Sequence, residues 1–498
     1  MYSNPSASSL PHLNYRWVFA ASLLLSAWLI ALDPLINRDA IIYLRSADAY
    51  LRDGFAASQQ LYGRPILPIC MAMVHKFTGI PMVYAGLILV SLAYALMCSA
   101  FVATVHTLGG DRRVQLIAAI VIISHPMLNH SRSSIMRDPI YWAFLLMAFR
   151  ELLLYLQQPN LAHRLRWFAY VLLATLFRFE GAFFAVLAPL SLLFTPGLEQ
   201  RLRHCLYLLV PQFLLVMLAT AGYLALSSDG GLLFPAIEKY ITRLQSVPAE
   251  FGEIAQNSAD ALLTFTARED AAFAAVTSLV ALLALNICRA MTWPWVITLL
   301  WGATKNLTGR FRPEHSALLL AHLLIGLFYL SLFLFINRFM LERYGSQVVI
   351  FLLLYIPFVL NSLWHAKGGA WKRVLVATLL LGMTLDSAHT GAGDKAFIRD
   401  AAQWVEEETP KQSSVVSNSK YIGYFGNREF DWRAVALQNF DLKSILARTE
   451  MWRDEDYLVM YVRPRDQENW EIFLRRNKLT ELISFGSGKK GRVAVIQL

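Results

Sequence analysis

The sequence predicts a polytopic α-helical membrane protein that ends in a small α/β domain. Hydrophobic residues make up 56% of the 498 positions and charged residues only 16%, which is more apolar than a soluble protein of this length needs. Apolar runs of about 20 residues, long enough to cross a hydrocarbon core, recur as far as residue 388. Beyond that point the composition becomes that of a soluble domain.

We expect about eleven membrane spans, with juxtamembrane helices in the first external loop. Each span is an apolar run bounded by charged or helix-breaking residues. The expected spans are Trp17–Leu32, Pro81–Leu108, Val114–Met127, Ile140–Leu156, Trp167–Phe177, Ala182–Phe194, Leu206–Leu226, Ala271–Ile287, Ser316–Ile336, Gln347–Leu363 and Val374–Leu385.

The loops indicate which way the chain crosses the membrane. Lys and Arg are denser in the loops on the N-terminal side than in those on the opposite side, which favours a cytoplasmic N-terminus. The apolar run after Arg16 is too long for a cleaved signal peptide, so we expect it to remain as an anchor. Residues 1–388 are then the transmembrane domain, with external loops at 33–80, 128–139, 178–181, 227–270 and 337–346, and residues 389–498 form an external domain.

The C-terminal segment alternates between helix and strand patterns. We expect helices at Lys395–Glu408 and Asn469–Lys478, and strands at Ser414–Ser417, Tyr457–Val462 and Arg492–Leu498. The segment contains no glycine-rich phosphate loop, metal-ligand spacing or nucleophile elbow, so we expect the chemistry in the membrane domain.

Net charge excludes one class of partner. The formal charge is +10, but the cations are spread over membrane-flanking loops and are not gathered on one soluble face. Membrane lipid head groups account for this distribution, and nucleic acid is not expected as a partner.

A charged amphipathic segment directly follows the first span. At about 3.6 residues per turn, Asp39, Tyr43 and Tyr50 fall on one helical face, beside a stripe of arginines at heptad spacing. Ionisable groups at the membrane edge suggest a site for a polar or charged substrate. The alternative is an interfacial helix whose arginines meet lipid head groups.

Three further groups of charges lie next to spans on the same predicted side. They are Arg137 with Asp138, Arg178 with Glu180, and Arg338 with Arg343 and Tyr344. Each has a purely structural alternative: an N-cap role for Asp138 before Pro139, a mutual ion pair for Arg178 and Glu180, and snorkelling for the two late arginines. A divalent metal on His125, His130 and Asp138 is a further alternative to hydrogen bonding by these histidines.

In the order of these parts the chain resembles the C-type superfamily of integral-membrane glycosyltransferases, which includes the protein O-mannosyltransferases and the aminoarabinose transferases of bacterial envelopes. The matching features are an acid soon after the first span followed by Tyr and Gly, an Arg-Asp, an Arg-x-Glu-Gly, a late Arg-Tyr and a C-terminal α/β domain. Their positions are Asp39, Tyr43, Gly54, Arg137, Asp138, Arg178 to Gly181, Arg343 and Tyr344. One departure is that many relatives have paired acids after the first span, whereas Ala40 follows Asp39 here.

The resemblance implies a polyprenyl-phosphate-sugar-dependent hexosyl- or pentosyltransferase in the bacterial inner membrane, with a periplasmic C-terminal domain. A sugar would pass with inversion from the lipid carrier to an envelope glycolipid, glycan or protein. Asp39 would be the base that takes the proton of the attacking hydroxyl, with Asp138 as the second candidate catalytic residue. Substrate binding would fall to Tyr43, Glu180, Tyr344 and the arginines, and Arg137, Arg178 and Arg343, with Arg338 behind them, would stabilise the phosphate leaving group.

Two other functions use arginines at a membrane face. One is a transporter or flippase for a lipid-linked anion, for which charges near the bilayer midplane and repeated halves are typical. The other is an envelope polysaccharide polymerase or ligase, in which we expect one large late loop. The charges lie at span ends, no repeat is visible and the late loops are short, so the sequence favours the transferase.

Overall fold

The structure is a computed structural model that describes residues 12–33, 35–226, 233–262, 264–307, 311–366, 370–389, 395–428, 452–487 and 490–498. It is mostly helical, with one small sheet, as expected for the fold class. Within these residues the chain forms two compact units. The first unit comprises Met1–Leu23, Leu92–Ser131 and Arg137–Ser387, and the second comprises Leu24–Ser91, Arg132–Met136 and Ala388–Leu498.

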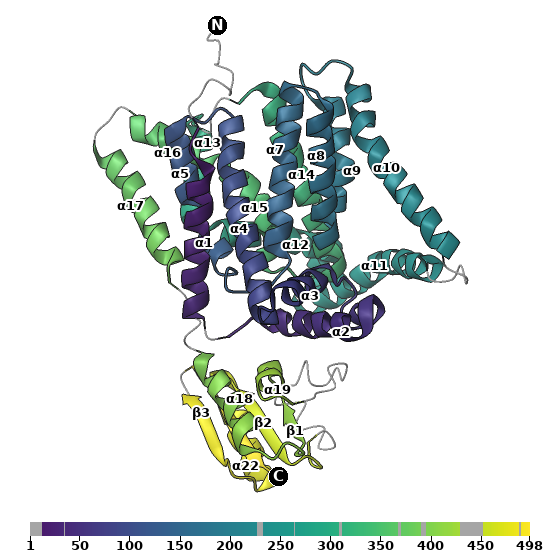
Figure 1. Ribbon diagram of the computed structural model, residues 1–498, viewed down its shortest axis with the longest axis vertical. Coiled ribbons are helices and arrows are strands. Elements are labelled where there is room, and N and C mark those ends of the chain that lie inside the picture. Colours follow the sequence, from purple (N-terminus) through teal and green to yellow (C-terminus); the bar gives the residue numbers. More distant parts are fainter. Residues whose placement is uncertain are drawn as a thin grey trace. The chain divides into compact units, whose positions relative to one another are not determined.

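The first unit is helical (Figure 1). Two helices, α1 (Tyr15–Leu32) and α4 (Met82–Thr107), belong in part to each unit. The others are α5 (Arg112–Ile123), α6 (Pro126–Asn129), α7 (Asp138–Gln157), α8 (Leu161–Phe177), α9 (Gly181–Ser191), η2 (Leu192–Phe194), α10 (Arg201–Leu226), α11 (Leu233–Leu262), η3 (Phe265–Asp270), α12 (Ala271–Met291), α13 (Trp293–Thr304), α14 (Pro313–Asn337), η4 (Glu342–Gly345), α15 (Ser346–Leu353), α16 (Ile356–His365) and α17 (Ala370–Ser387).

Six helices among the described residues are long and apolar enough to cross a membrane: α1, α4, α7, α10, α12 and α14. The segments Glu342–Leu353 and Ile356–His365, which are bent by 43° relative to each other, make a seventh span if they are counted together. The other expected spans coincide with shorter or less apolar helices, α5, α8, α9 and α17. Several spans are therefore present, and the number eleven stays a prediction.

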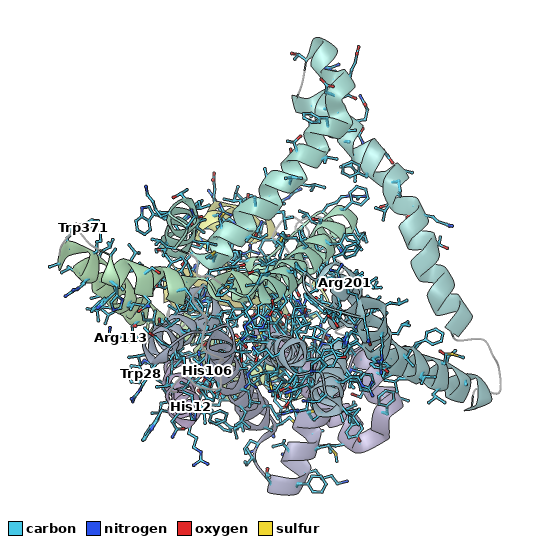
Figure 2. All side chains as sticks on the ribbon, turned by 90° about the horizontal axis from the view of Figure 1, so that it is seen from above. His12, Trp28, His106, Arg113, Arg201 and Trp371 are labelled. Atoms are coloured by element: carbon cyan, nitrogen blue, oxygen red, sulfur yellow. The ribbon has the colours of Figure 1, made fainter. Side chains whose placement is uncertain are left out.

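Rings and hydrogen bonds join the helices of the first unit. His322 on α14 lies 4.6 Å from Phe149 on α7 and 5.4 Å from Phe351 on α15, between ring centroids. At the start of the described chain, Leu13 N donates to Gln115 Oε1 over 2.8 Å, and the ring of His12 lies 6.4 Å from that of His106 (Figure 2). These contacts tie sequence-distant helices together.

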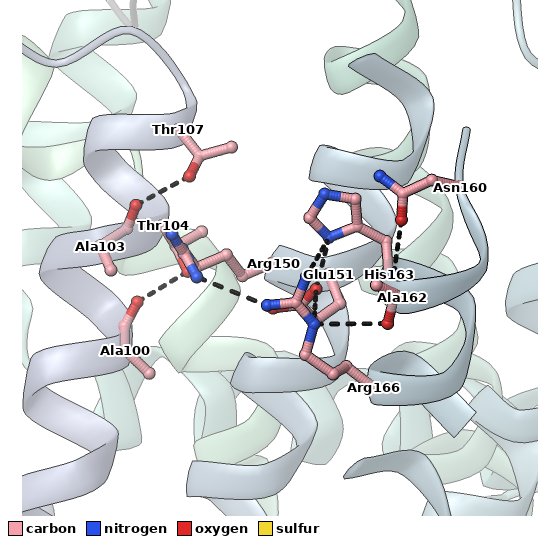
Figure 3. A network of polar contacts seen from close by, with 10 residues as sticks. All are labelled: Ala100, Ala103, Thr104, Thr107, Arg150, Glu151, Asn160, Ala162, His163 and Arg166. Carbon is pink, nitrogen blue, oxygen red and sulfur yellow. Dashed lines mark hydrogen bonds and ion pairs between the residues drawn. The ribbon is translucent and has the colours of Figure 1, made fainter. Parts of the chain in front are cut away.

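A buried acid on α7, Glu151, contacts basic side chains next to the turn between α7 and α8. Glu151 accepts from His163 Nδ1 over 2.7 Å and lies 3.4 Å from Arg166 Nε and 3.8 Å from Arg150 Nη1 (Figure 3). Asn160 caps α8 by accepting from the His163 backbone over 2.9 Å. A buried carboxylate is tolerated here because basic side chains from both helices surround it.

The second unit begins with a bent helix. Helix α2 (Arg38–Leu61) is interrupted at Gly54, whose φ of 81° lies in the left-handed region that favours glycine. The bend brings Ser46 Oγ to within 2.8 Å of Ser58 Oγ. Helix α2 ends at Leu61, and helix α3 (Ile66–Thr78) follows it.

The sheet of this unit has the order β1-β2-β4-β3. Strand β1 (Val415–Ser417) runs parallel to β2 (Tyr457–Val462), which pairs antiparallel with β4 (Gly491–Gln497), and β4 pairs antiparallel with β3 (Ile483–Ser487). Alternate residues of β2 face α18 (Ala396–Glu408) on one side and α22 (Gln467–Asn477) on the other. Strands β2 and β4 are thus buried between helices on both faces.

Two elements of this sheet region were not expected from the sequence. Strand β3 contains Gly486 at a φ of 96°, between Phe485 and Ser487, and a glycine inside a strand weakens its pattern. Helix α19 (Lys420–Phe425) has six residues, too few for a helical period to show.

Candidate functional site

The centre of the candidate site in the first unit is the Arg178 guanidinium, which lies between two carboxyl groups. Its Nη1 donates to Asp138 Oδ1, and its Nη2 and Nε donate to Glu180 Oε1, the latter over 2.8 Å. The three side chains are only 13%, 8% and 6% exposed, in the order Arg178, Asp138, Glu180. The Tyr329 hydroxyl on α14 adds a hydrogen bond to Glu180. Four polar groups from three parts of the chain thus form one buried network.

Local backbone geometry explains how Arg178 and Glu180 reach this position. Helix α8 ends at Phe177, Arg178 is extended, and α9 begins at Gly181. A Cβ atom on Gly181 would lie 2.6 Å from Thr175 N and 2.8 Å from its Cα, so only glycine permits the chain to pass so close to the preceding helix. The glycine of the Arg-x-Glu-Gly pattern is therefore required by packing.

Asp138 does not act as the N-cap that was one alternative for it. It is the first residue of α7, the preceding Arg137 occupies the N-cap position without a side-chain capping bond, and the Asp138 carboxyl group accepts from Arg178. The alternative that Arg178 and Glu180 pair with each other describes part of the geometry, since Asp138 shares the same guanidinium.

Charge balance follows from this arrangement. Burial raises the pKa of Glu180, but the Arg178 guanidinium and its hydrogen bond outweigh burial and leave that pKa below the ordinary value. Burial lowers the pKa of Arg178, and Asp138 and Glu180 raise it well above the ordinary value. Because one guanidinium faces two carboxyl groups, Arg178 has no surplus positive charge to offer an anion.

The late Arg-Tyr pair joins the cluster through an aromatic ring. The Cζ atoms of Arg178 and Arg343 each lie 5.5 Å from the centre of the Tyr344 ring, within the range of cation–π attraction. Arg343 and Tyr344 belong to η4, which follows the end of α14. Arg137 lies in the same unit beside Asp138, half-buried.

Arg338 takes a different partner. It caps α14 in the left-handed conformation, and its Nη2 lies 3.3 Å from Glu250 Oε2 on α11. The same part of α11 contacts α14 through Phe251, whose ring centre is 4.8 Å from that of Phe335. Arg338 thus holds α11, and is not part of the network around Arg178.

The remaining predicted residues, Asp39 and Tyr43, belong to the second unit. Asp39 is the second residue of α2 and is partly exposed beside the exposed Arg38. Tyr43 is 6% exposed, and its ring packs edge-on against Tyr62 at 5.0 Å. Asp39 is therefore partly accessible to solvent, whereas Tyr43 is buried in packing contacts.

The metal alternative finds no support in the described geometry. His125 Nδ1 accepts from Leu128 N over 3.4 Å, and Nε2 lies 3.3 Å from the Met291 carbonyl, so both ring nitrogens are engaged. Among the residues that the structure describes, no group of three His, Cys, Asp or Glu side chains is placed to hold a metal ion.

Two residues of the site were not singled out from the sequence. Tyr329 is an isolated aromatic residue inside an apolar span, and Glu250 is one of several acids on an amphipathic helix. Neither carries a local signal, because each matters only through a partner more than 80 residues away.

No protein-family model and no curated protein matches the sequence. Solved structures do match. The chain is similar to ArnT from Cupriavidus metallidurans bound to undecaprenyl phosphate, with a TM-score of 0.53 and 13% identity over 97% of this chain and 98% of that one. The apo state of the same protein gives a TM-score of 0.52 and 13% identity over 96% and 97%. The chain therefore shares the fold of ArnT, as expected from its resemblance to the C-type superfamily of integral-membrane glycosyltransferases.

Proposed function

We propose that the protein is an inverting glycosyltransferase that moves a sugar from a polyprenyl-phosphate carrier to an envelope acceptor on the outer face of the bacterial inner membrane. The observation that carries the proposal is the buried network of Arg178, Asp138 and Glu180, joined through Tyr344 to Arg343, at the ends of membrane-capable helices. The fold adds support, because ArnT shares it over nearly the whole chain and was solved with undecaprenyl phosphate.

The arginines divide into two roles in this proposal. Arg343 and Arg137 bind the phosphate of the carrier, whose negative charge grows as the sugar leaves. Arg178 holds Asp138 and Glu180 in place and presents one face to the Tyr344 ring, because its donors are already directed at two carboxyl groups. Phosphate binding by Arg178 itself would require one of these acids to move.

The chemical step is a single displacement. An acceptor hydroxyl attacks the anomeric carbon opposite the phosphate, the new C–O bond forms as the bond to the phosphate oxygen breaks, and the polyprenyl phosphate leaves. The proton of the hydroxyl passes to Asp39, the base, which is partly exposed at the start of α2. Inversion follows from attack on the opposite face.

The proposal includes the topology expected from the sequence. Residues 389–498 form a periplasmic domain, the loops that carry the arginines face the same side, and the chain crosses the membrane about eleven times. A labelling experiment on single-cysteine variants tests this arrangement independently of the chemistry.

Transport of a lipid-linked anion is the second candidate. The observation that favours it is the break between α8 and α9, which holds a charged pair between two apolar helices in the manner of broken transporter helices. Transport would leave the sugar–phosphate bond of the carrier intact, whereas transfer breaks it.

Binding of undecaprenyl phosphate to the purified protein in lipid nanodiscs tests the donor site. We expect Arg343→Met and Arg137→Met each to weaken binding about 10- to 100-fold, since a charged hydrogen bond contributes roughly 1.5–3 kcal/mol. Arg463→Met removes an exposed arginine of the C-terminal domain and is the matched control. Equal binding by all four proteins would contradict the proposed phosphate site. Release of free polyprenyl phosphate from a sugar-loaded carrier separates transfer from transport.

A further inference from the structure

Helix α19 of the C-terminal domain packs on α2, the helix that begins beside Asp39, and both belong to the second unit. The packing is anchored on either side. Leu35, just before α2, is 7% exposed in a core cluster with Ile398 and Ile422 of the domain, and Trp28 Nε1 donates to the Ala388 carbonyl over 3.1 Å. The start of α2 is therefore fixed against the domain.

Polar groups of α19 interact electrostatically with charged groups of α2 along this contact. Lys420 and Tyr421 at the start of α19 are under the electrostatic influence of Arg38 and Asp39. One turn further along α19, Tyr424 is influenced in the same way by Arg45 and Asp48, which lie about two to three turns along α2. The order of charges on α2 thus matches the order of polar groups on α19.

Burial has an electrostatic cost for these groups. Burial, followed by the nearby Arg38 charge, lowers the pKa of Lys420, and Asp39 opposes both effects. Burial raises the pKa of Tyr421 to about 12. Lys420 and Tyr421 are thus both half-buried beside the candidate base.

We infer that Lys420 and Tyr421 bind the acceptor, which carries an anionic group next to its reacting hydroxyl. The inference rests on the proposed function. A base must contact the hydroxyl whose proton it takes, so groups that flank Asp39 from the soluble domain flank the acceptor. Arg38 precedes Asp39 in α2, and Lys420 interacts electrostatically with both, so two cations favour an anion at this position.

The acceptor's anionic group is a phosphate or a carboxylate, and its source is a phosphorylated glycolipid or an acidic glycan. Lys420 binds this group and Tyr421 donates a hydrogen bond to the acceptor or stacks on its sugar ring. Both residues act in positioning, since the base and the phosphate-binding arginines lie elsewhere. Their loss therefore raises the KM for the acceptor and leaves kcat and the KM for the donor nearly unchanged.

The test is sugar transfer by the full-length protein in nanodiscs, using an envelope extract from cells without the gene as the acceptor. The variants are Lys420→Met, Lys420→Arg and Tyr421→Phe, with Lys411→Met, an exposed lysine of the same domain, as the matched control. Each variant is first checked for an unchanged unfolding temperature. The extract is used as isolated, after enzymatic removal of phosphate, and after chemical reduction of carboxylates.

We expect Lys420→Met to raise the acceptor KM about tenfold and Tyr421→Phe several-fold, while Lys420→Arg and Lys411→Met resemble the wild type. Removing the anionic group from the acceptor should raise the acceptor KM of the wild type about tenfold. The same treatment should not raise the acceptor KM of Lys420→Met any further. The treatment that has this effect identifies phosphate or carboxylate as the source.

Three results would overturn parts of this reasoning in distinguishable ways. An unchanged acceptor KM in Lys420→Met, with transfer abolished in Asp39→Asn, overturns the acceptor site alone. Equal use of treated and untreated extract by the wild type overturns the anionic class of acceptor. No transfer by the wild type overturns the proposed function and the acceptor site with it.

Discussion

Replacing Arg178 with methionine should destabilise the protein more than any other single loss of an arginine discussed above. The substitution keeps a long apolar stem but leaves the carboxyl groups of Asp138 and Glu180 buried at 8% and 6% exposure without their cation. Breaking a buried pair by removing one partner costs about 3–5 kcal/mol, and here two acids lose the same partner. Arg178→Lys keeps the charge but loses the planar fork, at a cost of about 1.5–3 kcal/mol.

Thermal unfolding in detergent, followed by intrinsic tryptophan fluorescence, measures this effect without any substrate. A loss of about 4 kcal/mol lowers the unfolding temperature by roughly 8 °C, at about 2 °C per kcal/mol for a long chain. Arg463→Met removes an exposed ion pair with Asp466 and should shift the unfolding temperature by about 2 °C or less. The triple variant with Arg178→Met, Asp138→Asn and Glu180→Gln should recover part of the loss, because no buried charge remains unpaired.

An Arg178→Met protein that unfolds at the wild-type temperature would refute this reasoning. So would a triple variant less stable than Arg178→Met, since removal of the uncompensated acids must help if their burial is the cause of the loss. Either result would mean that the cluster is hydrated and contributes little to stability.

Three further outcomes follow from the same geometry. Gly181→Ala forces the backbone of α8 to move and should lower both the unfolding temperature and the activity, whereas Gly382→Ala, with open space around its Cα, should change neither. Glu250→Gln removes the carboxylate that lies 3.3 Å from Arg338. If Arg338 lies behind the phosphate site, the freed arginine should tighten the binding of undecaprenyl phosphate, as measured by titration. Weaker binding would show instead that the contact between Glu250 and Arg338 positions the site. Glu180 has a lowered pKa in the folded state, so its contribution to stability is present above the ordinary value near 4.5 and is lost as the pH falls through the folded value; the unfolding temperature should drop on acidification, and Glu180→Gln should lessen that drop.

Local patterns were enough to predict much of the fold. The charged amphipathic segment formed α2 at the expected place because its apolar residues repeat at the helical period. The bend at Gly54 was not predicted, because it depends on a contact between Ser46 and Ser58 that exists only once the helix has folded back.

The candidate site shows the same division. Arg178 and Glu180 lie two residues apart, so their pairing was foreseeable, but Asp138 joins them from 40 residues away and only the packing of α7 against α8 brings it there. The contact of α19 with α2 spans most of the chain. No local rule predicts such contacts, since they follow from how whole elements pack.

The most direct test of the proposed function is mass spectrometry of envelope glycolipids and glycans from cells with the wild-type gene, without it, and with Asp39→Asn at matched protein level. We predict that one sugar mass disappears in both altered strains while the polyprenyl-phosphate carrier that holds this sugar accumulates. If Asp39→Asn gives the wild-type spectrum, Asp39 is not the base. If the deletion changes only the distribution of the lipid-linked sugar across the membrane, the protein is a transporter and the central claim is wrong.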